Sequence, residues 1–365
     1  MILKSNISTL IGILFLALMF HSCMDDDLNQ NPLHSKQSSG VFVVNEGNFT
    51  YSNASLSFYQ PADKSVLNDV FYQTNTLPLG DVAQSIEVRD SLAYVVINNS
   101  GKIFIISTEN FKYKGKITGF ISPRHIHFVS NTKAYVSDLY AGKLYIIDPM
   151  AQATVGSIDL GSHASSENMA QIGNKLYLTC WSYDNFLLVI DTQTDRLIDS
   201  IQVGKQPNSL VVDKNQNLWV LSDGGFPGSS YGQEQAQLIC INTSSNQIIK
   251  TFIFNDIQAS PSNLQINQSG DSLIFLYGNW SRSLSGAGIY KMAISDSELP
   301  TNAFLEQNDN IFYAFGIDPT SSDIYVSNTK DFSSRGEVFR FSENGQAIDT
   351  FDVGINPTAF GFWQP

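Results

Sequence analysis

Apolar and polar positions alternate along this chain in short runs, and the runs recur in pairs. Residues 93–96 (AYVV) form an aromatic and β-branched run, and after a short polar segment residues 102–106 (KIFII) form a second apolar run. The same pair recurs at residues 134–137 and 143–148. Short runs rich in β-branched and aromatic residues and separated by turn residues are typical of β-strands. We therefore expect two strands in each pair.

The pair of runs occurs seven times, and the less regular copies begin near residues 41, 176, 218, 274 and 324. A repeat of roughly 40–50 residues that contains only short strands is typical of a β-propeller. The sequence therefore predicts an all-β fold, a seven-bladed β-propeller with four antiparallel strands in each blade.

The two ends of the repeat array are incomplete in complementary ways. The array begins at residues 41–44 with a run of the kind expected for the second strand of a blade. It ends at residues 357–362 with a run of the kind expected for the first strand, which lies nearest the axis. We expect the last strand to complete blade one and close the ring, because closure removes exposed sheet edges.

The predicted innermost strands carry one apolar set of side chains and one small or polar set, in alternation. The small or polar set, which we expect near the narrow axis, is Ser85, His125, Asn168, Ser209, Asn263, Ala314 and Ala359.

The N-terminus has the features of an export signal. A short basic start is followed by an apolar stretch too short to span a bilayer as a mature helix. The segment ends at Cys23, in a context that resembles the lipobox of bacterial lipoproteins. The acidic residues 25–27 resemble the surface-export signal of lipoproteins in Bacteroidota. The resemblance implies a lipoprotein signal peptide at residues 1–22 and a lipidated Cys23.

We expect residues 23–39 to form a flexible acidic and polar tether and residues 40–365 to form the propeller. The implied location is the outer membrane, lipid-anchored and facing the cell surface. An ordinary cleaved signal with an incidental cysteine, followed by a plain solvated tether, is the alternative.

Two cysteines remain within the predicted propeller. Cys180 and Cys240 lie in strand runs of different blades. We expect buried free thiols, because unpaired cysteine packs as a small hydrophobic residue, and a disulfide is the alternative.

The charge of the chain argues against nucleic acid as a partner. The formal net charge is −13, and no run of lysine and arginine occurs. A groove that binds phosphates needs clustered positive charge.

Catalytic and metal-binding patterns are weak, so the sequence predicts neither an enzyme nor a metal site. His125, His127 and His163 could ligate Zn²⁺ or copper, but no acidic residue is spaced to orient them. A lactonase-type propeller would need an acid–base set in the channel. Four carboxylates are candidates for that set by position alone: Glu46, Asp138, Glu167 and Asp223.

The loops between the second and third strands favour ligand binding. They are rich in asparagine, glycine and exposed-type aromatic residues, which supply hydrogen-bonding groups and flat amphipathic area. The predicted ligand contacts are Asn45, Phe49, Asn98, Asp138, Tyr140, Trp181, Tyr183, Asn279, Trp280 and Arg282. For any single loop the alternative is that these residues only form turns and cover blade ends.

Two family resemblances sharpen this interpretation. Residues 94–98 resemble the YVTN-type propeller repeat. Residues 43–49 (VVNEGNF) and 54–59 (ASLSFY), together with the N-terminal features, resemble the surface lipoproteins of Bacteroidota that capture cobalamin for a TonB-dependent vitamin B12 transporter. The resemblance implies a corrinoid as ligand, not as a catalytic cofactor, and the transporter as protein partner. A glycan-binding lipoprotein of a polysaccharide-uptake system and a protein-interaction or adhesion scaffold are the alternatives.

Overall fold

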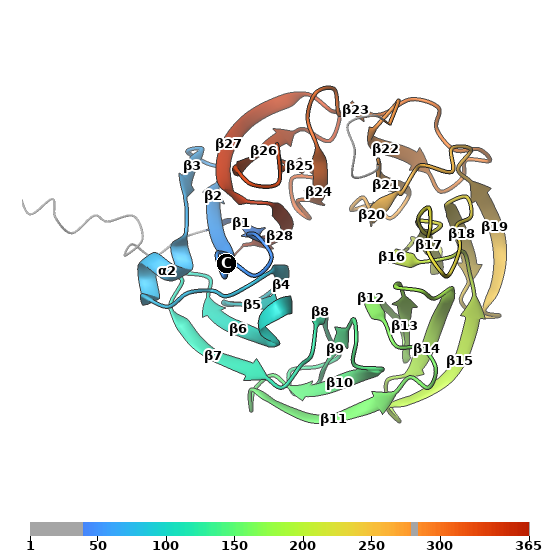
Figure 1. Ribbon diagram of the computed structural model, residues 1–365, viewed down its shortest axis with the longest axis horizontal. Coiled ribbons are helices and arrows are strands. Elements are labelled where there is room, and N and C mark those ends of the chain that lie inside the picture. Colours follow the sequence, from blue (N-terminus) through green and yellow to red (C-terminus); the bar gives the residue numbers. More distant parts are fainter. Residues whose placement is uncertain (1–38, 279–283, 365) are drawn as a thin grey trace, which may run out of the picture.

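A computed structural model describes residues 39–278 and 284–364 and shows seven sheets arranged around a central axis (Figure 1). Each sheet has four antiparallel strands, which confirms the predicted seven-bladed propeller. The predicted signal peptide, Cys23 and nearly all of the tether lie outside the described residues. In the described part of the chain no helix has the length and apolar character needed to cross a bilayer.

From the axis outward, blade one contains β28 (Pro357–Trp363), β1 (Gly40–Asn45), β2 (Ser55–Gln60) and β3 (Ser65–Leu67). In the same direction, blade two contains β4 (Ala83–Arg89), β5 (Leu92–Ile97), β6 (Lys102–Ser107) and β7 (Tyr113–Thr118). Blade three contains β8 (Pro123–Phe128), β9 (Ala134–Asp138), β10 (Lys143–Asp148) and β11 (Ala153–Asp159). Blade four contains β12 (Ser166–Ile172), β13 (Lys175–Cys180), β14 (Phe186–Asp191) and β15 (Arg196–Gln202). Blade five contains β16 (Pro207–Val212), β17 (Asn217–Ser222), β18 (Gln237–Asn242) and β19 (Gln247–Ile253). Blade six contains β20 (Ser262–Ile266), β21 (Ser272–Tyr277), β22 (Gly288–Ala293) and β23 (Leu305–Glu306). Blade seven contains β24 (Phe312–Ile317), β25 (Ile324–Asn328), β26 (Arg335–Phe341) and β27 (Ala347–Ile355). The helices within residues 39–278 and 284–364 are α2 (Val70–Asn75) and the 3₁₀ turn η2 (Asn98–Ser100).

The last strand closes the ring. Strand β28 pairs antiparallel with β1, with Phe360 opposite Val43, and forms the innermost strand of blade one. The Asn45 side chain, fully buried, accepts a hydrogen bond from the backbone N–H of Gly354 at 3.0 Å. A Cβ atom at Gly354 would lie 2.6 Å from Asn45 Cγ, so only glycine allows this approach. The predicted closure by the terminal strands is thus confirmed.

The core lies between neighbouring blades, where the apolar faces of the strands meet. Between blades one and two, the buried rings of Phe42, Phe58 and Phe111 form one aromatic cluster, and the Phe42 and Phe58 centroids are 4.8 Å apart. Cys180 and Cys240 are buried free thiols in strands β13 and β18, as predicted.

The sequence predicted only strands, and it did not predict helix α2, which lies in the connection from blade one to blade two. Val70 and Phe71 are its buried residues, and Phe71 stacks on Phe104 of β6 at 5.0 Å. Six residues are too few to show a helical period in the sequence, so tertiary packing decides this element.

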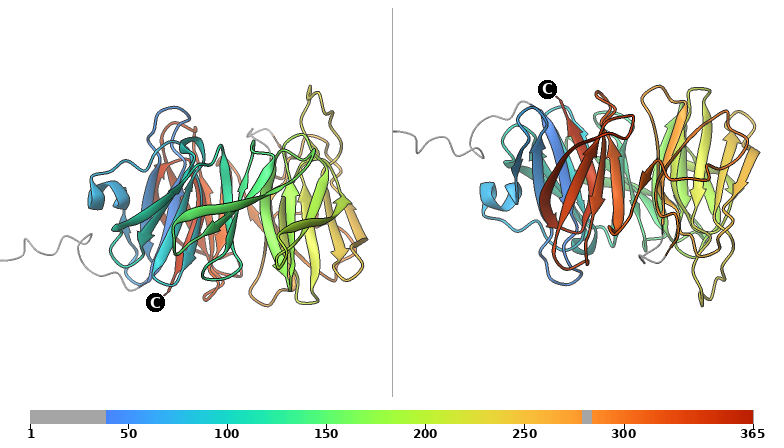
Figure 2. Two further views of the ribbon diagram at one scale, coloured as in Figure 1. Left: turned by 90° about the horizontal axis from the view of Figure 1, so that it is seen from below. Right: turned by 90° about the horizontal axis from the view of Figure 1, so that it is seen from above.

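The antiparallel order of the strands places two sets of loops at the same end of the propeller. The loops from second to third strand and the loops from one blade to the next both lie at this end, which we call the loop face. In the side views of Figure 2 the strands run between the two faces of the propeller, and the loops lie at these faces.

Candidate functional site

Every innermost strand has a β-bulge near its beginning. The register between first and second strand shifts there in all seven blades. A bulge bends the strand and re-aims a side chain. The second residue of every innermost strand lies at its bulge, and these seven residues are Gln84, Arg124, Glu167, Asn208, Asn263, Tyr313 and Thr358.

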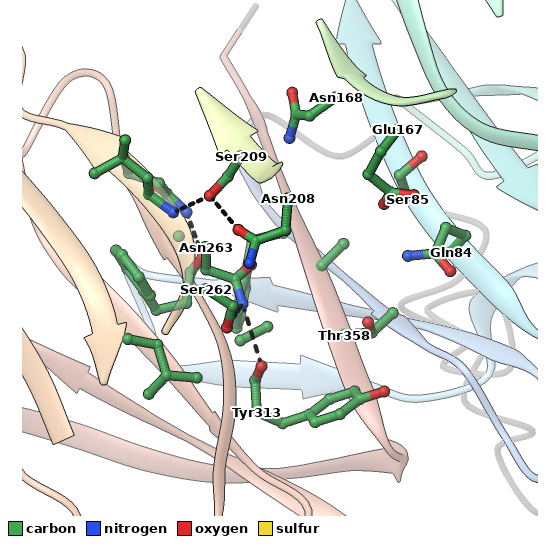
Figure 3. Close-up of a pocket in the computed structure, with 18 of the residues that line it drawn as sticks. Gln84, Ser85, Glu167, Asn168, Asn208, Ser209, Ser262, Asn263, Tyr313 and Thr358 are labelled. Atoms are coloured by element: carbon green, nitrogen blue, oxygen red, sulfur yellow. Dashed lines mark hydrogen bonds between the residues drawn. The ribbon is translucent and has the colours of Figure 1, made fainter. Parts of the chain in front are cut away.

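All seven of these residues line one cavity of about 390 Å³ on the axis. Figure 3 labels six of them, all except Arg124. Trp181, Asp223 and Phe332 also line it, and they come from loops of the loop face, so the cavity lies at that end of the channel. All seven members of the small or polar set expected near the axis line the same cavity, and several members of the apolar set, such as Ile86 and Phe360, line it too.

An ion pair and a further hydrogen bond join three consecutive blades at the cavity wall. Arg124 donates two hydrogen bonds to Glu167, from Nε to Oε2 at 2.7 Å and from Nη2 to Oε1 at 2.9 Å, and a third to Gln84 Oε1 at 2.6 Å. Burial alone would raise the pKa of Glu167, but the Arg124 charge and hydrogen bonds from His125 and Arg124 outweigh burial and lower it to about 2. Both charges are therefore neutralised within the protein.

Two further carboxyl groups near the cavity are held by uncharged donors. The Tyr313 hydroxyl donates to Glu46 Oε2 at 2.9 Å, and the Trp181 indole N–H donates to Asp223 Oδ2 at 2.8 Å. Burial raises the pKa of Glu46, and it raises the pKa of Asp223 to about 6. Because burial disfavours the charged forms, this wall suits neutral hydrogen-bonding groups better than ions.

A second group of polar side chains is held by the neighbouring innermost strands. Asn208 Nδ2 donates to the Pro261 carbonyl at 2.9 Å, and Ser209 Oγ donates to Asn208 Oδ1 at 2.7 Å. Asn263 Nδ2 donates to the Tyr313 carbonyl at 3.3 Å (Figure 3). These bonds fix the amides of blades five and six.

Three polar groups that line the cavity keep unused hydrogen-bonding capacity. Gln84 Nε2, Asn168 Nδ2 and the Thr358 hydroxyl have no hydrogen-bond partner among residues 39–278 and 284–364, and all three residues are only partly buried. Polar groups at such positions are available to a ligand.

Three of the sequence-predicted contacts bond within the protein and lie outside the cavity lining. Asn45 is buried between β1 and β2, and Asn98 Nδ2 donates to Ser122 Oγ at 2.8 Å. Asp138 is fully buried and accepts hydrogen bonds from the backbone N–H groups of Ile121 and Ser122, each at 2.9 Å. These side chains shape the loops, and none of the three lines the cavity.

The remaining predicted contacts divide into three groups. Trp181 lines the cavity. Phe49, Tyr140 and Tyr183 lie on loops of the loop face and are 68%, 66% and 54% exposed, outside the cavity lining. The last group lies outside the described residues: Asn279, Trp280 and Arg282. A ligand role for any of these residues stays a prediction.

None of the seven bulge residues that line the cavity was among the predicted ligand contacts. One signal was available, because a polar residue follows the first residue of several innermost strands, as Arg124 follows Pro123 and Asn208 follows Pro207. Simple alternation assigns one of two neighbouring residues to the axis, whereas a bulge turns both toward it.

The three candidate histidines do not converge on one site. His125 Nε2 lies 3.6 Å from Glu167 Oε1, His127 Nε2 lies 3.0 Å from Gln171 Oε1, and His163 Nδ1 lies 2.9 Å from Asp184 Oδ2. Each therefore has a different partner.

Comparison with known proteins identifies the family. A family described as a domain of unknown function (DUF5074) matches residues 39–363, so the chain belongs to it. None of the curated proteins matches the sequence.

Solved structures share the fold at low sequence identity. A quinoprotein alcohol dehydrogenase-like protein of Bacteroides thetaiotaomicron is 14% identical with a TM-score of 0.68, covering 89% of this chain and 78% of its own. A periplasmic gluconolactonase of Pseudomonas aeruginosa is 12% identical with a TM-score of 0.64, covering 89% and 99%. The hydrazine synthase of Kuenenia stuttgartiensis is 14% identical with a TM-score of 0.59, covering 76% and 88%. These likenesses show a propeller scaffold and leave open whether this chain is an enzyme.

Proposed function

We propose that this member of the DUF5074 family is a surface lipoprotein that binds a corrinoid at the loop face and passes it to a TonB-dependent outer-membrane transporter. It acts in this proposal as a binding protein without turnover, held at the outer membrane by a lipid on Cys23. The resemblance at residues 43–49 and 54–59 supports the ligand class, the anchor and the transporter.

The observation that carries the proposal is that polar groups without a hydrogen-bond partner in the described residues line the same cavity as aromatic rings. Gln84 Nε2, Asn168 Nδ2 and the Thr358 hydroxyl face a cavity that Trp181 and Phe332 also line. A corrin ring carries many peripheral amides around an apolar edge. Amide and hydroxyl donors match the carbonyl oxygens of those amides, and the indole and phenyl rings match the apolar edge.

The size of the cavity indicates how such a ligand sits. About 390 Å³ is at the small end of drug-sized pockets, and a corrin macrocycle with its side chains is larger. The ring would therefore span the mouth, with one amide-bearing edge inserted. Exposed aromatic residues around the loop face supply flat contact area for the remainder: Phe49, Tyr140, Tyr183 and Phe226.

Isothermal titration calorimetry with cyanocobalamin tests the proposal. The full chain should bind one equivalent with micromolar or tighter affinity. Trp181→Ala should weaken binding at least about tenfold, and Asn168→Ala about three- to tenfold, since one hydrogen bond contributes about 0.5–1.5 kcal/mol. Met150→Ala, an exposed residue on the opposite face, is the matched control and should bind like the wild type.

Two results would contradict the proposal. Absence of heat across a micromolar titration would exclude the vitamin, and oligosaccharide arrays would then test the glycan alternative. Equal weakening by Met150→Ala and Trp181→Ala would show that binding does not depend on the loop face.

A further inference from the structure

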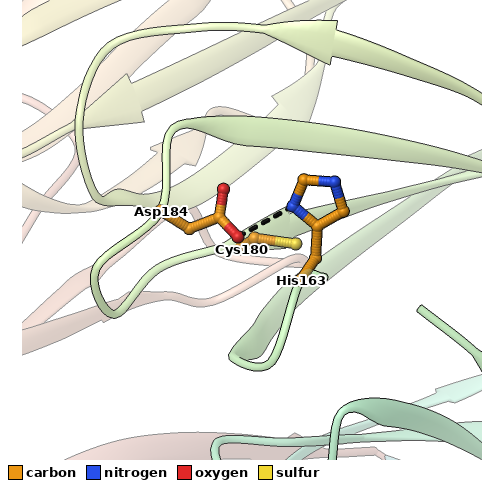
Figure 4. Close-up of side chains that lie close together, drawn as sticks. All are labelled: His163, Cys180 and Asp184. Atoms are coloured by element: carbon orange, nitrogen blue, oxygen red, sulfur yellow. Dashed lines mark hydrogen bonds and ion pairs between the residues drawn. The ribbon is translucent and has the colours of Figure 1, made fainter. Parts of the chain in front are cut away.

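A cluster of three different donor side chains lies in blade four. One donor atom each of His163, Cys180 and Asp184 lies within 4.8 Å of the other two (Figure 4). His163 comes from the loop before β12, Cys180 ends β13, and Asp184 lies in the loop between β13 and β14. Three separate segments of the chain therefore bring nitrogen, sulfur and oxygen together.

Two of the donors contact each other, and neighbouring groups hold both side chains. His163 Nδ1 and Asp184 Oδ2 are 2.9 Å apart, and the backbone N–H of Asn185 donates to Asp184 Oδ1 at 2.7 Å. The His163 ring packs against Phe186, with centroids 4.9 Å apart. The contacts from Asn185 and Phe186 come from outside the cluster, and contacts of that kind hold metal ligands in position.

We propose that His163, Cys180 and Asp184 bind one borderline divalent transition-metal ion of the Zn²⁺ type. Nitrogen, thiolate and carboxylate donors are the set that such ions take, and three protein donors leave a fourth position for water. On binding, the metal–sulfur bond replaces the S–H bond and the Cys180 proton passes to solvent.

The distances require a small adjustment. Zinc bonds of ~2.0 Å to nitrogen or oxygen and ~2.3 Å to sulfur place tetrahedral donor atoms roughly 3.3–3.6 Å apart. The donor atoms lie at most 4.8 Å apart, and His163 Nδ1 and Asp184 Oδ2 only 2.9 Å apart, so side-chain movements of about 1 Å would bring all three pairs to the tetrahedral distances.

Burial favours a metal over a nucleophile as the role of Cys180. Cysteine, histidine and aspartate also make up nucleophilic sites, but Cys180 is 0% exposed and no substrate carbon could reach its sulfur. The side chains of His163 and Asp184 are 18% and 11% exposed, which gives a small ion an entry route.

The proposed ion would tie the loop before β12 to the loop after β13. Trp181, which lines the cavity, directly follows Cys180. Metal binding is thus expected to fix this part of the cavity wall, but the metal proposal does not depend on which ligand the cavity takes.

Titration of the full chain with Co²⁺, after treatment with a chelator and its removal, tests the proposal. One equivalent should produce the near-ultraviolet charge-transfer band of a cobalt–thiolate bond, and Zn²⁺ should displace it. Cys180→Ser should abolish the band, and His163→Ala should weaken Co²⁺ binding at least about tenfold. Cys240→Ser, which changes the other buried thiol, is the matched control and should keep the band.

The proposal is overturned if excess Co²⁺ gives no charge-transfer band with the wild-type chain, or if Cys180→Ser keeps it. If Cys180→Ser does not fold, His163→Ala and Asp184→Asn decide the matter, because both residues lie on loops. Unchanged Co²⁺ affinity in both variants would overturn the proposal equally.

Discussion

Replacing Glu167 by glutamine is expected to destabilise the propeller in a pH-dependent way. Glu167 is 5% exposed, and its carboxylate accepts two hydrogen bonds from Arg124. Glutamine keeps the shape of the side chain but removes the charge, so the Arg124 guanidinium would be left without its counter-ion. The change therefore isolates the ion pair at the cavity wall.

The magnitude follows from the pKa of Glu167. In the folded protein its pKa is lowered from 4.5 to about 2, a difference of about 2.5 units, which corresponds to about 3 kcal/mol. Breaking a buried ion pair typically costs ~3–5 kcal/mol, in agreement. Because the folded-state pKa is the lower one, this stabilisation is complete well above pH 4.5 and is lost as the pH falls toward 2.

Urea unfolding followed by circular dichroism, at several pH values between about 7 and about 2.5, measures the effect. The free energy of unfolding of Glu167→Gln should lie about 3 kcal/mol below the wild type at about pH 7 and about 1 kcal/mol below it near pH ~2.5. Glu298→Gln, at an exposed glutamate, is the control and should follow the wild type throughout. A difference between Glu167→Gln and wild type that stays constant with pH would refute the reasoning.

Three further predictions concern packing, titration and closure. Gly316→Ala should cost about 1–3 kcal/mol of stability in thermal unfolding, because the new Cβ would lie 2.7 Å from the Cβ of Phe360 in β28. Gly156→Ala is the control and should cost far less, because its Cβ would lie 3.5 Å from the nearest atom. Equal costs would contradict this packing argument. The fluorescence of Trp181 should change with a midpoint near pH 6 as Asp223 ionises, and Asp223→Asn should remove that transition; persistence of the transition would assign it elsewhere. Deleting residues 357–365 should open the ring and cause aggregation in size-exclusion chromatography, since β1 loses its inner partner; a monomeric, cooperatively unfolding product would contradict closure.

The regular repeat made the fold predictable, because each blade repeats one strand pattern that local alternation reveals. The incomplete ends at residues 41–44 and 357–362 were enough to predict closure. Helix α2 could not be predicted, because the burial of Phe71 against another blade forms only in the folded chain.

The candidate site was less predictable than the fold. The bulges that turn Gln84 and Asn208 into the channel depend on register between strands, which no single strand encodes. Asp138 is a residue type expected among ligand contacts, but its carboxylate accepts hydrogen bonds from two backbone N–H groups. Loop composition alone does not distinguish a side chain that forms a turn from one that faces a ligand.

A crystal structure of the full chain saturated with cyanocobalamin tests the central claim most directly. The account predicts the corrin ring across the mouth of the channel at the loop face, with an amide-bearing edge toward Gln84 and Asn168 and the ring edge against Trp181. A corrinoid on the opposite face or the outer strands, or a saturated crystal whose channel mouth holds no corrinoid, would contradict it.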